Sequence, residues 1–324
     1  MTVKLLPLFW ILILLSISFC ESNSSVESGY DIIEWERSKE NPVFRDSIPD
    51  INYEVASDSH VFIDEDDSLK MIYTGDFNDT SSIKLASGGS VSNWDKQTIL
   101  LYEAGPSGKD VYKETPFYRK ASSGKHQIYY IGYEDEETYQ SEIYLSEADE
   151  LEGPYTQRSE PVVPRGNIAG EDVYLITSPS VVEHNDLLYM TFIGWDASPN
   201  EVTEIWIIGA TSNDDGHSWT DFQKVDVPIG AEGQITKLPN EEFVAARTGS
   251  YEDREAIFYA TANHPLGPWT EQSEPILIQS GPPYEADEVI APQIFHDPFN
   301  NKQYVYYTGA DYQEGWWIMM AEKK

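Results

Sequence analysis

The sequence is poor in basic residues and in cysteine. Of its 324 residues, 56 are Asp or Glu and only 21 are Lys or Arg, which gives a formal net charge of −35. No stripe of Lys and Arg is available to neutralise phosphates, so the composition argues against nucleic acid as a partner. The single cysteine excludes an intramolecular disulfide. The acidity is typical of a solvated, soluble surface, and adaptation to a high-salt or cation-rich medium is the alternative.

Several signals of specific chemistry are also missing. Gly88-Gly89 is not followed by the lysine and helix of a phosphate loop. There is no Gly-x-Ser-x-Gly elbow for a serine nucleophile. The six His are scattered and form no His-x-x-x-His pair, and Asp64-Glu65-Asp66-Asp67 is most simply a solvated turn. The spacing of these residues therefore predicts no metal site.

One long apolar run is present, at the N-terminus. Lys4 precedes the run Leu5 to Phe19, and Cys20 follows it with a polar tail. A run of about 15 apolar residues is typical of a secretory signal and is short for a membrane span. We expect residues 1–20 to be a signal peptide and residues 21–30 a flexible tether. The position of Cys20 resembles a bacterial lipoprotein cleavage site, although Phe19 is larger than the usual preceding residue, so ordinary cleavage nearby is the alternative.

The rest of the chain is a repeat of strands. Apolar residues show no 3.6-residue period, whereas β-branched and aromatic runs alternate with Gly, Asn, Asp and Pro. A three-residue signature that ends in Gly recurs every 55 to 62 residues or so, roughly the length of a four-stranded propeller blade. Its five copies are Tyr73-Thr74-Gly75, Tyr130-Ile131-Gly132, Phe192-Ile193-Gly194, Arg247-Thr248-Gly249 and Tyr307-Thr308-Gly309.

The ends of the repeat predict how it closes. A short strand precedes each signature and another follows it, and Gly153-Pro154-Tyr155, Gly216 to Trp219 and Gly267-Pro268-Trp269 lead into a fourth strand. The fifth unit stops at Lys324 without a fourth strand, and Trp35 to Phe44 reads like the missing one. Because an open strand edge invites unwanted pairing, we predict that residues 31–324 form one all-β domain. Its expected fold is a five-bladed β-propeller, closed by an N-terminal strand that completes the last blade.

Equivalent positions ahead of each first strand carry carboxylates in three of five units. The five positions are Asp58, Glu114, Ser178, Glu232 and Ala291. In a propeller such positions form a ring at one mouth of the central channel. Glycoside cleavage needs two carboxyl groups there, one to protonate the leaving oxygen and one to activate water.

The repeat and its entry residues resemble glycoside hydrolase family 43 and its five-bladed relatives, which include arabinanases, arabinofuranosidases, xylosidases and, more distantly, fructan hydrolases. The residues that carry the resemblance are Asp58-Ser59, Glu232-Gly233 and the Gly-Pro-aromatic turns, and it covers about Tyr30 to Lys324. It implies that Asp58 is the general base and Glu232 the general acid. Ser178 stands where the family has an Asp that tunes the acid, and Glu114, Glu171 or Asp172 are the candidates for that role.

A second set of residues is expected to contact the sugar. Aromatic and acidic residues follow the repeated Gly, including Asp76 and Trp195, and suit stacking on a sugar face and hydrogen bonding to hydroxyls. The alternative is packing between turns. His60, two residues after Asp58, and Ser178 are further candidate contacts. Arg247 is either an ion-pair partner within the fold or a substrate clamp.

The turn from Ser212 to Trp219 matches an Asp-box, Ser-x-Asp-x-Gly-x-Ser-Trp, a turn found in sialidases and many other propellers. We expect it to be structural, because its Asp and Ser tie a tight hairpin.

These observations predict an exported, exo-acting glycosidase that acts on arabinose-, xylose- or galactose-containing polysaccharide or oligosaccharide. Blades one and four are not adjacent, which favours the wider carboxyl separation of an inverting enzyme, roughly 6.5–9.5 Å. A glycan-binding surface protein without activity is the alternative, motivated by Ser178, and a protein-interaction scaffold is a third. We expect a monomer at the cell surface or in the periplasm that needs no cofactor and touches the membrane only through a lipid on Cys20. A channel cation such as calcium would fit the resemblance, but no ligands for it are indicated.

Overall fold

The structure, a computed structural model, describes residues 34–47, 53–77, 80–198, 201–226 and 232–324. The expected signal peptide, Cys20 and the tether lie outside these ranges. Within them the chain forms strands and no helix, which confirms the all-β prediction. No helix in the described part is long and apolar enough to cross a membrane.

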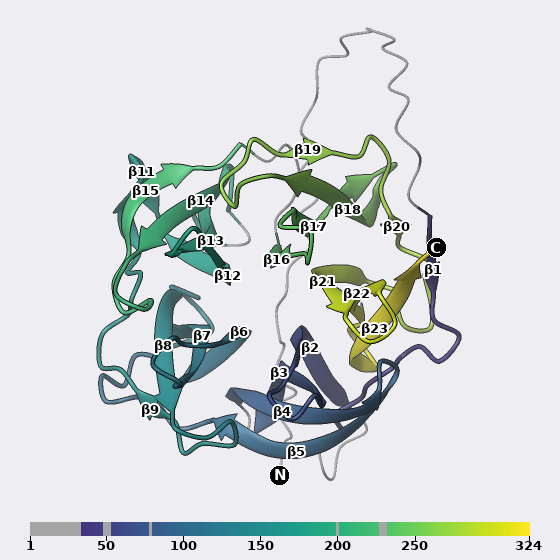
Figure 1. Cartoon of the computed structure of the whole chain (residues 1–324), viewed down its shortest axis with the longest axis horizontal. Helices are drawn as coiled ribbons and strands as arrows, with labels where there is room; N and C mark the ends of the chain where they lie inside the picture. The colour runs from purple at the N-terminus through teal and green to yellow at the C-terminus, as the bar shows by residue number, and fades with distance from the viewer. Residues whose placement is uncertain (1–33, 48–52, 78–79, 199–200, 227–231) are drawn as a thin grey trace, which may run out of the picture.

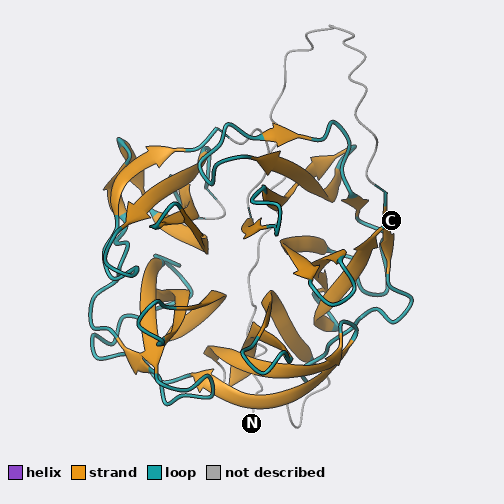
Figure 2. Cartoon of the chain, in the orientation of Figure 1, coloured by secondary structure: helices purple, strands orange, loops and turns teal. Residues whose placement is uncertain are grey.

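The strands form antiparallel groups arranged around a common centre, with β2, β6, β12, β16 and β21 innermost (Figure 1). Loops and turns connect them at the rim (Figure 2). This arrangement is consistent with a β-propeller. In chain order the groups are β2 (Glu54–Ile63), β3 (Leu69–Phe77), β4 (Thr80–Ser90) and β5 (Asn93–Leu101); β6 (Tyr112–Lys120), β7 (His126–Tyr133), β8 (Glu142–Ala148) and β9 (Thr156–Gln157); β12 (Leu175–His184), β13 (Leu187–Trp195), β14 (Ile205–Ser212) and β15 (Thr220–Lys224); β16 (Gly233–Lys237), β17 (Phe243–Tyr251), β18 (Arg254–Ala262), β19 (Thr270–Glu271) and β20 (Leu277–Ile278); and β21 (Glu288–Asp297), β22 (Lys302–Asp311) and β23 (Gly315–Lys323). A short hairpin of β10 (Gly166–Ile168) and β11 (Glu171–Val173) precedes β12.

The N-terminal segment supplies an outer strand to the last group. The first strand, β1 (Trp35–Arg37), pairs antiparallel with β23, so this part of the prediction agrees with the structure. The Arg37 guanidinium donates to both carboxylate oxygens of the buried Glu285 at 2.8 Å each. A parallel pairing of Glu54 with Gly315 also links β2 to β23. The last group is therefore joined to both the N-terminal segment and the first group.

The repeated signature has a physical explanation at each residue. The Thr hydroxyl bonds to the neighbouring group: Thr308 accepts from the Asp58 amide at 3.0 Å, and Thr74 accepts from the Thr115 amide at 3.1 Å. The Gly leaves room for a passing segment, since a Cβ on Gly309 would lie 2.5 Å from the Tyr284 carbonyl oxygen. Local packing therefore selects these residues in several units.

The aromatic residue of the signature carries a buried hydroxyl in three groups. Each of these hydroxyls donates to a carboxylate that is at most 2% exposed and that also contacts a Lys or Arg. The three pairs are Tyr73 with Asp46, Tyr130 with Asp110, and Tyr307 with Glu285, at 2.8 to 2.9 Å. Arg247 occupies the same position in the fourth group. In that group the signature position in β17 carries a cation, Arg247, in place of a tyrosine.

The innermost strands are interrupted where the candidate catalytic residues lie. In β2, β6, β12 and β21 the pairing register shifts, and a residue with positive φ stands at each shift. These residues are Asp58 (φ 51°), Thr115 (φ 48°), Ser178 (φ 52°) and Ala291 (φ 50°). The counterpart of Asp58 in the second group is thus Thr115, and the predicted equivalence with Glu114 was wrong by one residue.

The backbone directly after Glu232 lies close to the neighbouring strand β17. Gly233, with φ 150°, pairs directly with Arg247, and no register shift interrupts β16. A Cβ at Gly233 would lie 1.9 Å from the Ala246 carbonyl oxygen, so only glycine fits there. Glu232 accepts a backbone hydrogen bond from Thr248, at the same level as Glu114, which pairs with Ile131.

The Asp-box turn joins two groups, as expected for a structural element. Asp214 accepts hydrogen bonds from Ser212 and Ser218 within the turn. Asp215 accepts from the Arg119 guanidinium at 3.0 Å and from the amides of Ser122 and Ser123 at 3.2 Å. The turn after β14 is thereby fixed to β6 and to the turn that follows β6.

Candidate active site

Four buried carboxyl groups lie in, or directly before, innermost strands from four different groups. Their exposed fractions are 4% for Asp58, 3% for Glu114, 4% for Glu232 and 6% for Glu288. Asp58 lies at the register shift of β2, Glu114 is in β6, Glu232 immediately precedes β16, and Glu288 opens β21. Among the described residues none of the four forms an ion pair with Lys, Arg or His. We call Asp58, Glu114, Glu232 and Glu288 the carboxylate cluster.

Hydroxyl groups hold part of this cluster in place. The Ser57 hydroxyl donates to Asp58 Oδ2 at 2.7 Å. Tyr133 and Tyr139 each donate to Glu114 at 2.7 Å, one to each oxygen. The Tyr312 hydroxyl donates to Glu288 Oε1.

Other carboxyl oxygens of the cluster are buried without a hydrogen-bond partner. They are Asp58 Oδ1, Glu232 Oε2 and Glu288 Oε2. Unpaired buried oxygens of this kind favour a bound proton or a polar ligand.

Burial raises the pKa values of Asp58 and Glu232 by different amounts. It raises the pKa of Asp58 to about 6. Burial first, and then the charges of Asp58, Glu288, Glu255 and Glu114, raise the pKa of Glu232 well above its ordinary value. The raised pKa of Glu232 favours its protonated form, whereas the hydrogen bond from Ser57 favours the ionised form of Asp58. A pair in these two states can act as general acid and general base.

The remaining two members also bind protons more tightly than usual. Burial, followed by the charge of Asp58, raises the pKa of Glu114 to about 7. Burial, followed by the charge of Glu255, raises the pKa of Glu288 to about 8. Like charges in a site without cations oppose further ionisation.

Aromatic rings line the Glu114 side of the cluster. Tyr112 stacks on Tyr133 with ring centroids 5.0 Å apart, and Tyr133 lies 4.4 Å from Tyr139. Trp195 packs in an apolar cluster beside Tyr139 and donates its indole N–H to Thr177 at 3.2 Å. Trp195 is thus a packing residue next to the site, only 5% exposed.

The structure brings only some of the expected contact residues to the cluster. Asp76 is half-buried at the end of β3, where its charge raises the pKa of Glu136 after burial. Ser178 is buried at the register shift of β12, and it offers a hydroxyl where the resemblance implies a carboxylate. Glu171 lies in the β10–β11 hairpin and forms an ion pair with Lys224.

Arg247 pairs with Gly233, the residue after Glu232, but among the described residues it forms no ion pair with the carboxylate cluster. It is 3% exposed, and the carboxylate whose charge acts on its pKa is Glu271 of β19. Its Nε and Nη2 atoms have no hydrogen-bond partner. Among the described residues Arg247 forms no ion pair, so its role, as an ion-pair partner within the fold or as a substrate clamp, stays a prediction.

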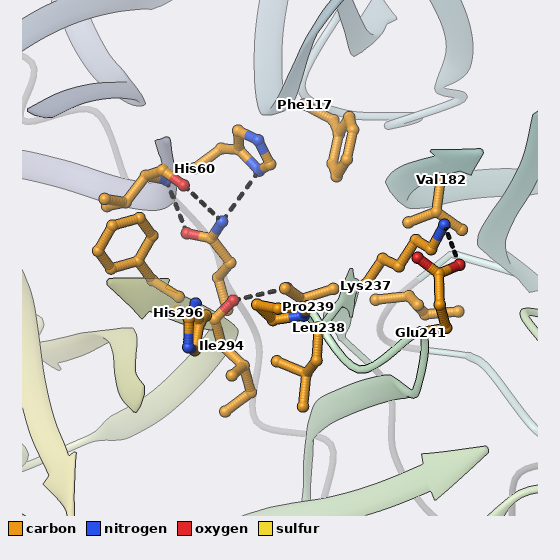
Figure 3. Close-up of a pocket in the computed structure, with 14 residues that line it drawn as sticks. His60, Phe117, Val182, Lys237, Leu238, Pro239, Glu241, Ile294 and His296 are labelled. Carbon is orange, nitrogen blue, oxygen red and sulfur yellow. Dashed lines mark hydrogen bonds and ion pairs between the residues drawn. The ribbon is translucent and has the colours of Figure 1, made fainter. Parts of the chain in front are cut away.

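His60 lines a separate pocket, further along the innermost strands than the carboxylate cluster. The pocket has a volume of about 430 Å³ and includes Phe117, Lys237 and His296 (Figure 3). His60 Nδ1 lies 2.6 Å from Gln234 Oε1, and its ring centroid is 4.2 Å from that of Phe117. Burial lowers the pKa of His60 to about 4, so the ring is neutral.

The sequence reasoning missed Glu288, Glu255, Tyr139 and Tyr312. A signal existed for Tyr312, because it follows Asp311 just as Phe77 follows Asp76 after the repeated Gly. Glu288 stands in the acidic run Glu285 to Glu288 and has no counterpart in the other units. In the described ranges no group of three or more His, Cys, Asp or Glu could hold a metal ion.

The fold has many solved counterparts, although no family model and no curated protein matches the sequence. A family 43 β-xylosidase/α-arabinofuranosidase from a compost microbial metagenome is 17% identical, with a TM-score of 0.63 over 89% of this chain and 94% of that one. An endo-1,4-β-xylanase from Bacteroides thetaiotaomicron is 15% identical, with a TM-score of 0.61 over 84% and 91%. The chain has the fold of the family 43 glycoside hydrolases.

The family 43 fold does not decide the reaction. An N-acetylgalactosamine deacetylase from F. plautii is also similar, at 12% identity and a TM-score of 0.63 over 86% of this chain and 93% of that one. Deacetylation is not glycoside cleavage. The function must therefore be argued from the residues of the site.

Proposed function

We propose that the protein is a glycoside hydrolase in which Glu232 is the general acid and Asp58 the general base. The observation that carries this proposal is the pair of buried carboxyl groups, each with an oxygen that has no hydrogen-bond partner and with no cation in contact among the described residues. Burial supplies the protonated donor, and the hydrogen bond from Ser57 favours the ionised form of Asp58. Glu114 assists as a third carboxyl group whose charge acts on Glu232.

The mechanism is inversion, and the action is on chain ends. Asp58 and Glu232 come from the first and fourth groups of strands, and non-adjacent groups suit the roughly 6.5–9.5 Å that a water molecule between the carboxyl groups requires. The proposed substrates are arabinose-, xylose- or galactose-containing polysaccharides or oligosaccharides. The xylanase and the β-xylosidase/α-arabinofuranosidase counterparts support xylose and arabinose.

The structural setting of this proposal is a closed five-bladed propeller in an exported monomer. The pairing of β1 with β23 and the repeat of five signatures support closure by the N-terminal strand. The apolar run before Cys20 supports export to the cell surface or periplasm, with Cys20 as the lipid-bearing residue.

The experiment is hydrolysis of arabinosides, xylosides and galactosides by the chain starting at Ser22, with the anomer of the released sugar followed by NMR. The first product formed is expected to have the configuration opposite to that of the substrate. Asp58→Asn should abolish turnover. Retention of configuration would contradict inversion, and full activity of Asp58→Asn would contradict the base assignment.

A glycan-binding protein without activity is the second candidate, favoured by Ser178 in place of the expected carboxylate. Oligosaccharide binding with no turnover across the same substrates would support it.

A further inference from the structure

We propose that Glu288 is the positioning residue that holds the proton on Glu232, in place of the third-group carboxylate that Ser178 replaces. This inference rests on the proposed function only for its catalytic meaning, because the coupling of Glu232 and Glu288 can be measured without turnover.

The topology places Glu288 next to Glu232. Glu288 is the first residue of β21, and Glu232 immediately precedes β16. The strands β16 and β17 both contact β21, and β16 lies beside β21 at the centre of the molecule (Figure 1). The two carboxyl groups thus enter the same region from neighbouring groups of strands.

The surroundings of Glu288 leave its charge unbalanced. Tyr312 donates to one of its oxygens, and the other has no hydrogen-bond partner. Its neighbour Glu255 is fixed by the Val289 amide, which donates to Glu255 Oε2 at 2.6 Å. No Lys, Arg or His in the described ranges forms an ion pair with Glu288 or Glu255. A second buried charge beside them is therefore opposed.

Four carboxyl groups from the elements packed around Glu232 act on it. They are Asp58 of β2, Glu114 of β6, Glu255 of β18 and Glu288 of β21. Asp58 has to ionise to serve as base, and two Tyr hydroxyls hold Glu114. Glu255 accepts a hydrogen bond from the backbone amide of Val289. Asp58 and Glu288 each keep one buried oxygen without a hydrogen-bond partner, and Glu288 is the one of the two that has no part in the proposed reaction.

The coupling works through the order of ionisation. When Glu288 loses its proton, its charge opposes ionisation of Glu232, so the proton stays on Glu232 at higher pH. Ser178 has no charge with which to do this. Glu288 accordingly extends the pH range in which the acid is ready to donate.

The test is a pH titration of the Glu232 carboxyl by NMR, with glutamate labelled by carbon-13 at the side-chain carboxyl. The Glu232 resonance is assigned by its loss in Glu232→Gln. In Glu288→Gln the midpoint should fall by about one pH unit or more. Glu288→Asp should keep the charge and stay near the wild-type midpoint. Glu314→Gln, an exposed neighbour of Tyr312, should not change the midpoint and serves as the matched control.

The outcomes separate the inference from the proposed function. An unchanged Glu232 midpoint in Glu288→Gln overturns the inference, whatever the activity. If Glu288→Gln does not fold, Glu288→Ala with the same readout replaces it. A lowered midpoint in a protein that cleaves no glycoside supports the coupling and contradicts the proposed function. In an active enzyme, the basic limb of kcat/KM against pH should fall together with the NMR midpoint.

Discussion

Glu288 and Glu114 of the carboxylate cluster, together with the neighbouring Glu255, predict that the free energy of unfolding falls as pH rises from about 6.5 to about 8.5. Burial raises the folded-state pKa of Glu288 to about 8 and of Glu114 and Glu255 to about 7. The unfolded chain has already lost these protons in that range. The folded state therefore binds more protons than the unfolded state, and this advantage disappears as pH passes through the raised pKa values.

The size of the effect follows from these values. For Glu288 the loss between pH 6.5 and 8.5 is about 2 kcal/mol of unfolding free energy. Glu114 and Glu255 each contribute roughly 1 kcal/mol. Together these losses are a large part of the stability of a typical domain, roughly 5–15 kcal/mol.

The choice of window limits the contribution of competing groups. Burial lowers the pKa of His60 to about 4 and also lowers the pKa values of His126 and His264, so these rings are neutral in the folded state. In the unfolded chain a histidine is still about half protonated at about pH 6.5, so these three residues offset a small part of the loss at the acid end of the window. The raised pKa of His217, to which Glu147 contributes, acts in the same direction as the cluster. Comparison with Glu288→Gln isolates the contribution of Glu288 from that of His217.

The assay is urea denaturation at both pH values for wild type, Glu288→Gln and the exposed control Glu314→Gln. Wild type and control should lose stability by the same amount, and Glu288→Gln should lose about 2 kcal/mol less. Equal stability of wild type at the two pH values, or higher stability at pH 8.5, would refute the reasoning.

Three further substitutions test the contacts between groups of strands. Arg37→Met leaves the Glu285 carboxylate buried without its cation and should cost roughly 3 kcal/mol or more of unfolding free energy, measured by urea denaturation. Asp215→Asn weakens the bonds to Arg119 and should cost about 1–3 kcal/mol, also seen as a lower thermal midpoint. Thr308→Val leaves the Asp58 amide unpaired and should cost about 1–3 kcal/mol and lower kcat.

Each of these variants has an exposed counterpart of the same chemistry. Arg254→Met, Asp253→Asn and Thr270→Val should change stability by less than about 0.5 kcal/mol. An Arg37, Asp215 or Thr308 variant as stable as its counterpart would contradict the role given to that contact.

Much of the fold could be predicted from the sequence, because the same short-range contacts require the same residues in several groups of strands. In several groups the Thr of the signature accepts a backbone hydrogen bond and the Gly leaves room for a neighbouring segment, so both residues recur in the sequence. The pairing of β1 with β23 was predictable for a similar reason, since Trp35 to Phe44 resembles the fourth-strand tails of other units.

The site was less accessible to sequence reasoning. In Lys113-Glu114-Thr115-Pro116 the sequence does not show whether Glu114 or Thr115 corresponds to Asp58. The strand pairing shows that the counterpart is Thr115. The role proposed for Glu288 depends on the contact between β21 and β16 and on the carboxyl oxygen of Glu288 that has no hydrogen-bond partner. No repeat marks such a residue, because a single group of strands carries it.

The most direct measurement of the central claim compares Glu232→Gln with wild type on two kinds of glycoside. Loss of the general acid should lower kcat/KM by roughly 10²- to 10⁴-fold on oligosaccharides, whose leaving oxygen needs a proton. The loss should be much smaller on aryl glycosides with a strongly acidic phenol. Wild-type activity of Glu232→Gln on the oligosaccharides would contradict the assignment of Glu232 as the acid.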